Sequence, residues 1–170
     1  MFRKIFSAVI FTALFVLAQN VSAQPNIDFQ GHVEGYGWLR PVGNGQVIGT
    51  TGEGRRLEAL IINFDGDIRY SAHVQNIGWQ RWAYSGDVAG TVGEGLRMEA
   101  IRIQLDDRAA QYYDIYYRAH VEQLGWLGWA CNGEPAGTVG AGLRIEALQI
   151  ELVPRGERFH RGRGPAFYEG

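Results

Sequence analysis

Cysteine, lysine and long apolar runs are scarce in this chain, and each scarcity excludes something. Cys131 is the single cysteine, so an internal disulfide is excluded and the fold depends on packing. Lysine occurs once, at Lys4, and eighteen acidic residues face sixteen basic ones. This balance lacks the basic excess typical of proteins that bind nucleic acid. After the first 23 residues, no run is long and apolar enough to span a bilayer.

The first 23 residues contain the one strongly apolar segment. Arg3 and Lys4 precede the run IFSAVIFTALFVLA, and VSA then leads to Gln24. A basic start, a short apolar stretch and small residues before a cleavage point are typical of a secretory signal peptide. We therefore expect residues 1–23 to be removed and the protein to be secreted, in an extracellular, periplasmic or cell-surface location. Residues 24–170 are enough for one domain with its own core.

From Gln24 onward the sequence contains three tandem copies of one pattern. Each copy has His-Val, a Gly-Trp pair, a glycine-rich loop (GTTGEG, GTVGEG or GTVGAG) and the motif Arg-x-Glu-Ala, at offsets of 41 and 47 residues. Six extra residues in DDRAAQYYD, before the third histidine, account for the unequal offsets. We place the repeats at about 27–66, 67–107 and 114–153, within a domain of residues 24–153.

Each copy is predicted to form β-strands. In the second copy, IRYSAHV alternates apolar and polar residues, and LRMEAIRIQL changes parity at Ala100–Ile101, which predicts a β-bulge there. No window shows a convincing helical period. Three β units of this size cannot each bury a face alone. The prediction is therefore an all-β, single domain of three tandem repeats with pseudo-threefold symmetry, β-prism-like, with a β-trefoil as the alternative.

The repeated motifs resemble those of the clostridial hydrophobic repeats with a Gly-Trp signature, the ChW repeats. The resemblance extends over roughly Ile27 to Leu152. It implies a secreted or surface-attached protein with a role in adhesion, polysaccharide interaction or protein contact. The first copy departs from the other two, because Pro41 stands where they have Trp82 and Trp129.

The tryptophans fall into two sets with different expected roles. One tryptophan follows a glycine in all three copies and is predicted to be a core residue, with the repeated histidines in a structural role: Trp38, Trp79, Trp126, His32, His73 and His120. Trp82 and Trp129 come three residues later, with opposite parity in an extended strand, which favours exposed platforms that stack on sugar rings. The residues expected to hydrogen-bond the same ligand are Gln80, Arg81, Thr91, Glu94 and Thr138.

The repeated histidines and glutamates also invite catalytic and metal-binding interpretations. Three histidines around a threefold axis can converge on an ion, but we favour a hydrogen bond from each ring to a backbone group, and we expect neither a metal nor a cofactor. Glu58, Glu99 and Glu146 resemble glycosidase carboxylates only superficially. A glycosidase needs two acids in different environments, whereas a threefold repeat provides equivalent ones. We favour salt bridges for Arg-x-Glu and expect no enzymatic activity.

Together these features predict a non-catalytic, lectin-like carbohydrate-binding module. Several weak sites on one chain are expected to engage a glycan or cell-surface polysaccharide together. The alternative is a structural or adhesion module that uses the same aromatic face to contact surface proteins. Residues 154–170, PRGERFHRGRGPAFYEG, are predicted to form a basic, flexible tail.

Overall fold

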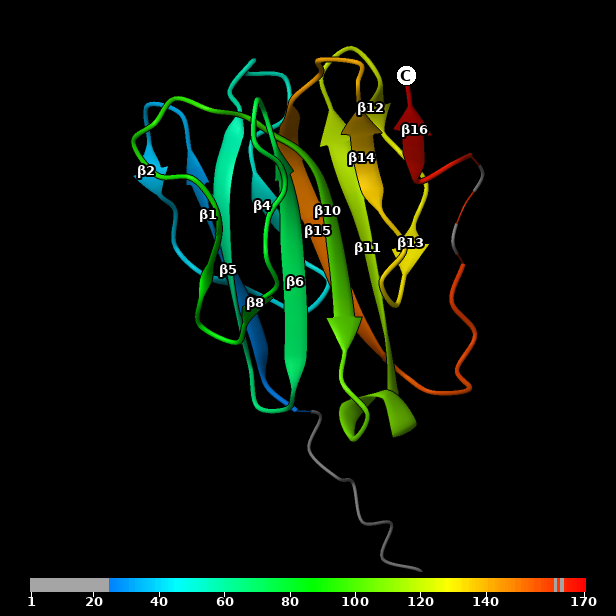
Figure 1. Ribbon diagram of the computed structural model, residues 1–170. Helices are drawn as coiled ribbons and strands as arrows, with labels where there is room; N and C mark the ends of the chain where they lie inside the picture. Colours follow the sequence, from blue (N-terminus) through cyan, green and yellow to red (C-terminus); the bar gives the residue numbers. More distant parts are fainter. Residues whose placement is uncertain (1–24, 161, 163) are drawn as a thin grey trace, which may run out of the picture.

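The computed structural model describes residues 25–160, 162 and 164–170 (Figure 1). The predicted signal peptide lies outside these residues. Within them the chain forms β-strands and a single 3₁₀ turn, η1 (Ala109–Gln111), and no α-helix. The prediction of an all-β fold is therefore confirmed.

A pair of long antiparallel strands forms the framework of each repeat. We call this pair the long hairpin, although three short strands lie between its two strands in the sequence. Its two strands alternate between residues that face the interior and residues that face outward, so the inner faces supply the core. The three hairpins are β1 (Ile27–Val33) with β5 (Leu57–Phe64), β6 (Ile68–Val74) with β10 (Met98–Leu105), and β11 (Tyr113–Val121) with β15 (Ile145–Pro154).

Two very short strands in each repeat fold back onto the first long strand of the same hairpin. The Gly-Trp pairs form one set, and the other set follows a few residues later. They are β2 (Gly37–Trp38) and β3 (Val42–Gly43) on β1, β7 (Gly78–Trp79) and β8 (Ala83–Tyr84) on β6, and β12 (Gly125–Trp126) and β13 (Ala130–Cys131) on β11.

A third short strand leaves each repeat and joins the sheet of a neighbour. Strand β9 (Val88–Gly90) of repeat 2 pairs with β5, and β14 (Ala136–Val139) of repeat 3 pairs with β10. Strand β4 (Val47–Gly49) of repeat 1 pairs with β15 of repeat 3, which closes the ring. Three sheets, each holding one strand from another repeat, thus surround a common core in a prism-like arrangement.

The exchanged strand explains two of the sequence motifs at once. Ala59 of the Arg-x-Glu-Ala motif lies opposite Gly90, the first glycine of the next repeat's loop. Gly90 has a φ of 100°, and a Cβ there would lie 2.2 Å from the carbonyl oxygen of Glu58. Gly49 and Gly137 are crowded in the same way, by the backbone of residues 146–147 and 99–100. Only glycine fits this junction, so the glycine loop and the Glu-Ala pair meet across repeats.

A β-bulge on the second long strand of each hairpin turns a glutamate outward. In repeat 2 the register shifts between Met98 and Ala100, next to the position that the sequence predicted. Met98 and Ile101 can therefore both face the core while Glu99 leaves the ladder. Repeats 1 and 3 shift at the equivalent place, where Glu58 and Glu146 are the additional residues.

Two of the three junctions between repeats also contain a buried tyrosine. The Tyr70 hydroxyl accepts a hydrogen bond from the Ile62 N–H (3.1 Å) and donates to the Asp87 carbonyl, so it joins repeat 2 to β5 of repeat 1. Tyr117 bonds Ile103 and Glu134 in the equivalent way. Burial raises the pKa of Tyr70 to about 12 and also raises that of Tyr117.

Candidate functional site

The outer face of every sheet carries the same four side chains, one each of arginine, glutamate, histidine and tryptophan. In repeat 1, Glu58 lies 3.0 Å from Nδ1 of His32 and 2.8 Å from Nε of Arg56. The His32 ring meets the ring of Trp38 edge-on, with centroids 5.3 Å apart. Repeats 2 and 3 have the same arrangement: the histidine–carboxylate distances are 3.1 and 3.2 Å, and the ring centroids lie 5.5 and 5.4 Å apart.

These contacts show what the repeated histidines and glutamates do. The glutamates are 4–6% exposed, so each buried carboxylate has its charge balanced by the arginine two residues before it and lies against the histidine of the opposite strand. The histidine partner is thus a carboxylate and not the backbone group that we had expected. No group of three or more metal-ligating side chains occurs in the described part of the chain.

The sequence suggested that the three repeated tryptophans lie in the core, but the structure places them on the outer faces of the sheets. Trp38 is 36% exposed, and Trp79 and Trp126 are partly buried against histidine. The reason is their pairing: each lies at the edge of its sheet, directly opposite the repeated histidine of the long strand, and directly paired residues share a face of the sheet. The core is instead filled from the inner faces of the long hairpins.

The second tryptophans form a further layer with arginines that the sequence analysis missed. The Arg102 guanidinium lies 4.7 Å from the ring centroid of Trp79 and 4.4 Å from that of Trp82. In repeat 3, Arg118 lies 4.7 Å from Trp126 and 4.8 Å from Trp129. Residues 80–82 do not continue the strand, so both rings reach the same cation despite their odd spacing. We call each of these sets a Trp–Arg–Trp cluster.

The two arginines come from opposite strands of their hairpins. Arg102 is on the second long strand, opposite Ser71, whereas Arg118 is on the first, opposite Gln149. Repeat 1 has Gln30 and Ile61 at these positions and Pro41 in place of the second tryptophan. The signal in the sequence was an arginine at an outward position in only those two copies that have a second tryptophan.

In repeat 2 the Trp–Arg–Trp cluster borders an open groove of about 710 Å³. Three of the predicted ligand-binding residues line this groove, namely Gln80, Arg81 and Trp82, together with Asp87. Gln80 is already engaged, because its side-chain amide donates to the carbonyl of Gly90 (3.1 Å) and accepts from the N–H of the same residue (2.6 Å). Arg81 and Asp87 are exposed.

The other predicted ligand-binding residues lie elsewhere. Thr91 and Thr138 are 8% and 1% exposed, which leaves little of either side chain accessible to a ligand. Glu94 is exposed in the glycine loop but does not line the groove. Trp129 is partly buried, with the ring of Phe159 against it (centroids 5.0 Å apart). The glycine loops thus serve the junctions between repeats, and the groove is made by the segment after the Gly-Trp pair.

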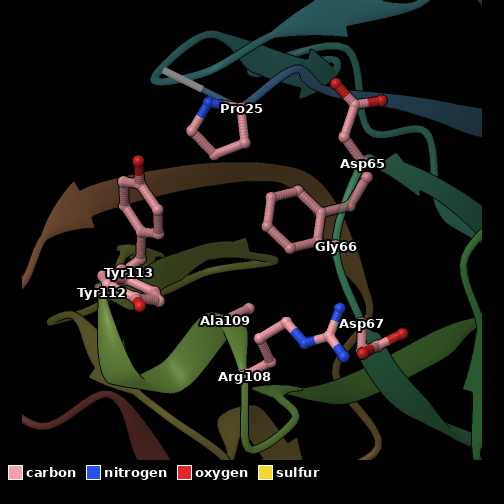
Figure 2. A pocket seen from close by; sticks show the side chains of 9 residues that line it. Pro25, Asp65, Gly66, Asp67, Arg108, Ala109, Tyr112 and Tyr113 are labelled. Carbon is pink, nitrogen blue, oxygen red and sulfur yellow. The ribbon is translucent and has the colours of Figure 1, made fainter. Parts of the chain in front are cut away.

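A second hollow, of about 270 Å³, lies at the end of the prism where the six extra residues of repeat 3 form η1 (Figure 2). Figure 2 shows Tyr112 and Tyr113 on one side of it and the turn from Asp65 to Asp67 on the other. The sequence shows these six residues as an insertion in repeat 3 but indicates no role for them.

The described residues contain no helix that is long and apolar enough to cross a membrane. Neither a comparison with curated proteins nor one with solved structures found a match. The family model described as Clostridial hydrophobic W matches three times, at residues 32–66, 73–107 and 120–154. Each match begins at a repeated histidine and together they cover more than half of the chain, so the chain belongs to the Clostridial hydrophobic W family.

Proposed function

We propose that this protein is a secreted or cell-surface, non-catalytic module that binds carbohydrate in the groove of repeat 2. The observation that carries the proposal is an aromatic surface beside exposed polar groups. Trp82 borders the groove, and Arg81 and Asp87 are exposed at the same place. Flat indole rings stack on the apolar face of a pyranose while neighbouring charged groups bond its hydroxyls.

The Trp–Arg–Trp cluster prepares the groove for such a ligand. Arg69 and Arg102 project from the outer face of the sheet and both contact the Trp82 ring, at 5.0 and 4.4 Å. These two contacts hold the ring in place at the wall of the groove. A ring that is already ordered loses little conformational entropy on binding, so a shallow site of this kind can still select a ligand.

The buried glutamates support a binding role over hydrolysis. Each lies between an arginine and a histidine on its own sheet, and the three are equivalent by the symmetry of the repeats. Glycoside hydrolysis uses two carboxyl groups in different environments at one cleft. In the repeat 2 groove, Asp87 is the carboxylate that lines the wall.

A glycan-array screen of the chain from Gln24 to Gly170 tests the proposal. Trp82→Ala should abolish the binding that the wild-type protein shows, because the stacking surface is removed. Trp38→Ala is the matched control, since Trp38 is exposed but has no second tryptophan beside it. Circular dichroism should show the same fold for all three proteins. Loss of binding in Trp38→Ala and not in Trp82→Ala would move the site to another face.

One observation favours a second candidate, recognition of a protein. Ile77 and Val88 line the same groove and are 50% and 48% exposed, and Tyr84 nearby is 55% exposed. Apolar side chains at the edge of an aromatic groove are typical of a protein interface. If no glycan binds, cross-linking at the cell surface with and without Ile77→Ser distinguishes this function, because only a protein partner is expected to require Ile77.

A further inference from the structure

The C-terminal segment lies over the Trp–Arg–Trp cluster of repeat 3. The ring of Phe159 stacks on Tyr116, with centroids 4.0 Å apart and planes 17° apart, and meets Trp129 edge-on. In repeat 2 the position of Tyr116 is taken by Arg69, and the cluster is open. Two clusters of the same construction therefore differ in whether the chain itself covers them.

The segment is held by main-chain hydrogen bonds as well as by Phe159. Its last strand, β16 (Phe167–Glu169), is the red arrow in Figure 1 and pairs in parallel with β14. The N–H of Gly128 donates to the carbonyl of Pro165, and that of Gly137 donates to Ala166, both at 2.9 Å. The described part of the predicted flexible tail is thus docked, an outcome that its composition did not indicate.

Repeat 3 has two residue changes that make room for this segment. A Cβ at residue 128 would lie 2.2 Å from the carbonyl oxygen of Gly164, so glycine is required there, whereas repeats 1 and 2 have Arg40 and Arg81. The second change is Leu127, which occupies the position of Gln80. Gln80 bonds the N–H of Gly90, and in repeat 3 Ala166 of the segment bonds the equivalent N–H of Gly137.

The covering segment is attached through an exposed connection. Residues 155–158 follow β15, are exposed and include Arg155 and Arg158. The anchor beyond them is a strand of three residues, and short terminal strands open at low free energy. The cover can therefore leave repeat 3 by local opening or by cleavage after an arginine, which ends its pairing with the exchanged strand β14 but leaves the pairing of β14 with β10 in place.

We propose that the C-terminal segment is a releasable cover over a second carbohydrate site formed by Trp126, Arg118 and Trp129. This inference rests on the proposed function, since it assigns to repeat 3 the same class of ligand as to repeat 2. With the cover in place the chain has one open site, and without it the chain has two. Release therefore converts a monovalent binder into a bivalent one, which strengthens attachment to a polymer with repeated sugars.

Two full-length variants test the cover. Gly128→Arg introduces the residue of the other repeats and should expel the segment, because the three atoms nearest to a Cβ at that position all belong to the segment. Phe159→Ala should uncover the aromatic rings while β16 remains paired. Glu157→Ala, in the exposed connection, is the control. Oxidation of Trp129 by N-bromosuccinimide, followed by mass spectrometry, should be faster in the first two variants and unchanged in the control.

The second measurement is the number of ligands per chain, by calorimetry with a glycan that the array identifies. The expected change is from one in the wild type to two in Gly128→Arg, and Trp82→Ala should abolish binding in the wild type but leave one site in the Gly128→Arg background. If Trp129 reacts equally fast in all proteins, the cover does not exist. If Trp129 becomes reactive but the stoichiometry stays at one, repeat 3 is not a ligand site. If no protein binds glycan, the proposed function and the second carbohydrate site both fail, while the oxidation rates still decide whether the segment is a cover.

Discussion

The junctions between the repeats are alike in all three copies, whereas the surfaces around the second tryptophan position differ from copy to copy. At the junctions, all three repeats use the same glycine against the same Glu-Ala pair, and the same glutamate, histidine and tryptophan follow on the outer face. At the position of the second tryptophan, by contrast, one repeat has proline, one has an open Trp–Arg–Trp cluster, and one has a covered cluster.

The physical cause of this contrast is closure of the ring. Each exchanged strand holds two repeats, so a change at one junction weakens the whole prism, and every junction must keep the same close backbone contact. The side chains around the second tryptophan position lie on the outer faces and belong to no exchanged strand. These side chains are therefore free to diverge, and divergence there changes the surface of a repeat without changing the fold.

The largest expected effect comes from adding one methyl group at a junction. Gly90→Ala should lower the free energy of unfolding by about 3 to 5 kcal/mol, because the Cβ would overlap the Glu58 carbonyl at a positive φ. Gly93→Ala is the matched control, with φ 77° and no atom within 4 Å of the added carbon, and should cost about 1 kcal/mol. Urea denaturation measures both, and equal losses would contradict the role of the junction.

Removal of a buried carboxylate ranks next. Glu99→Ala should lower the free energy of unfolding by about 2 to 3 kcal/mol, because Arg97 and His73 lose the anion between them. Glu94→Ala, in the exposed glycine loop, should change it by less than about 0.5 kcal/mol. Thermal unfolding measures the difference, and a Glu99 variant as stable as the Glu94 variant would show that the repeated cluster has little structural importance.

The tyrosine junctions differ from the third junction, where Phe29 takes the equivalent position. There the Asn44 side chain bonds the backbone of Leu152, as Ser85 bonds that of Phe64 at the Tyr70 junction. Tyr70→Phe should cost about 1 to 2 kcal/mol, because the Ile62 N–H loses its acceptor. The folded state holds the pKa of Tyr70 at about 12, above the ordinary value of 10.0, and so favours the neutral phenol. Its contribution is complete below pH 10 and is lost as the pH rises from 10 to 12.

Denaturation curves at pH 9 and pH 11.5 check this prediction. The wild type should lose stability between the two pH values, and Tyr70→Phe should lose less. Because Tyr117 has a raised pKa for the same reason, the double variant Tyr70→Phe/Tyr117→Phe should show a still flatter dependence. An identical loss in all three proteins would assign the alkaline effect to other groups.

The smallest effect on stability is expected where the repeats already differ. Pro41→Trp with Ile61→Arg would rebuild a Trp–Arg–Trp cluster in repeat 1, at an exposed residue and a half-buried one. The free energy of unfolding should change by less than about 1 kcal/mol. Ring-current shifts of the introduced guanidinium protons, measured by NMR, should show whether the cluster forms, and the single Ile61→Arg variant is the control.

Several features were predictable because they depend on local spacing. The three copies, the long hairpins and the bulge follow from alternation and from its change of parity near Ala100. The positions of Trp38, Trp79 and Trp126 were not predictable in this way. The large apolar area of tryptophan and its recurrence in all three copies placed them inside, but each lies in a short edge strand directly opposite an outward-facing histidine.

The residues that line the groove were predicted only in part. Trp82 and Arg81 do border the groove, whereas Gln80 is engaged with Gly90 and Thr91 is buried. A loop that is rich in glycine and threonine resembles a ligand loop in sequence. Its partner here is the backbone of another repeat, which no local pattern indicates.

The sequence by itself determined that the protein consists of three equivalent β units, since repetition and alternation are properties of the chain. Only the tertiary structure decided how the outer faces of these units differ. The strand exchange and the C-terminal segment over repeat 3 both join residues that are far apart in the chain. Contacts of this kind depend on how the units close around a shared core, because a hairpin alone has no neighbour to supply them.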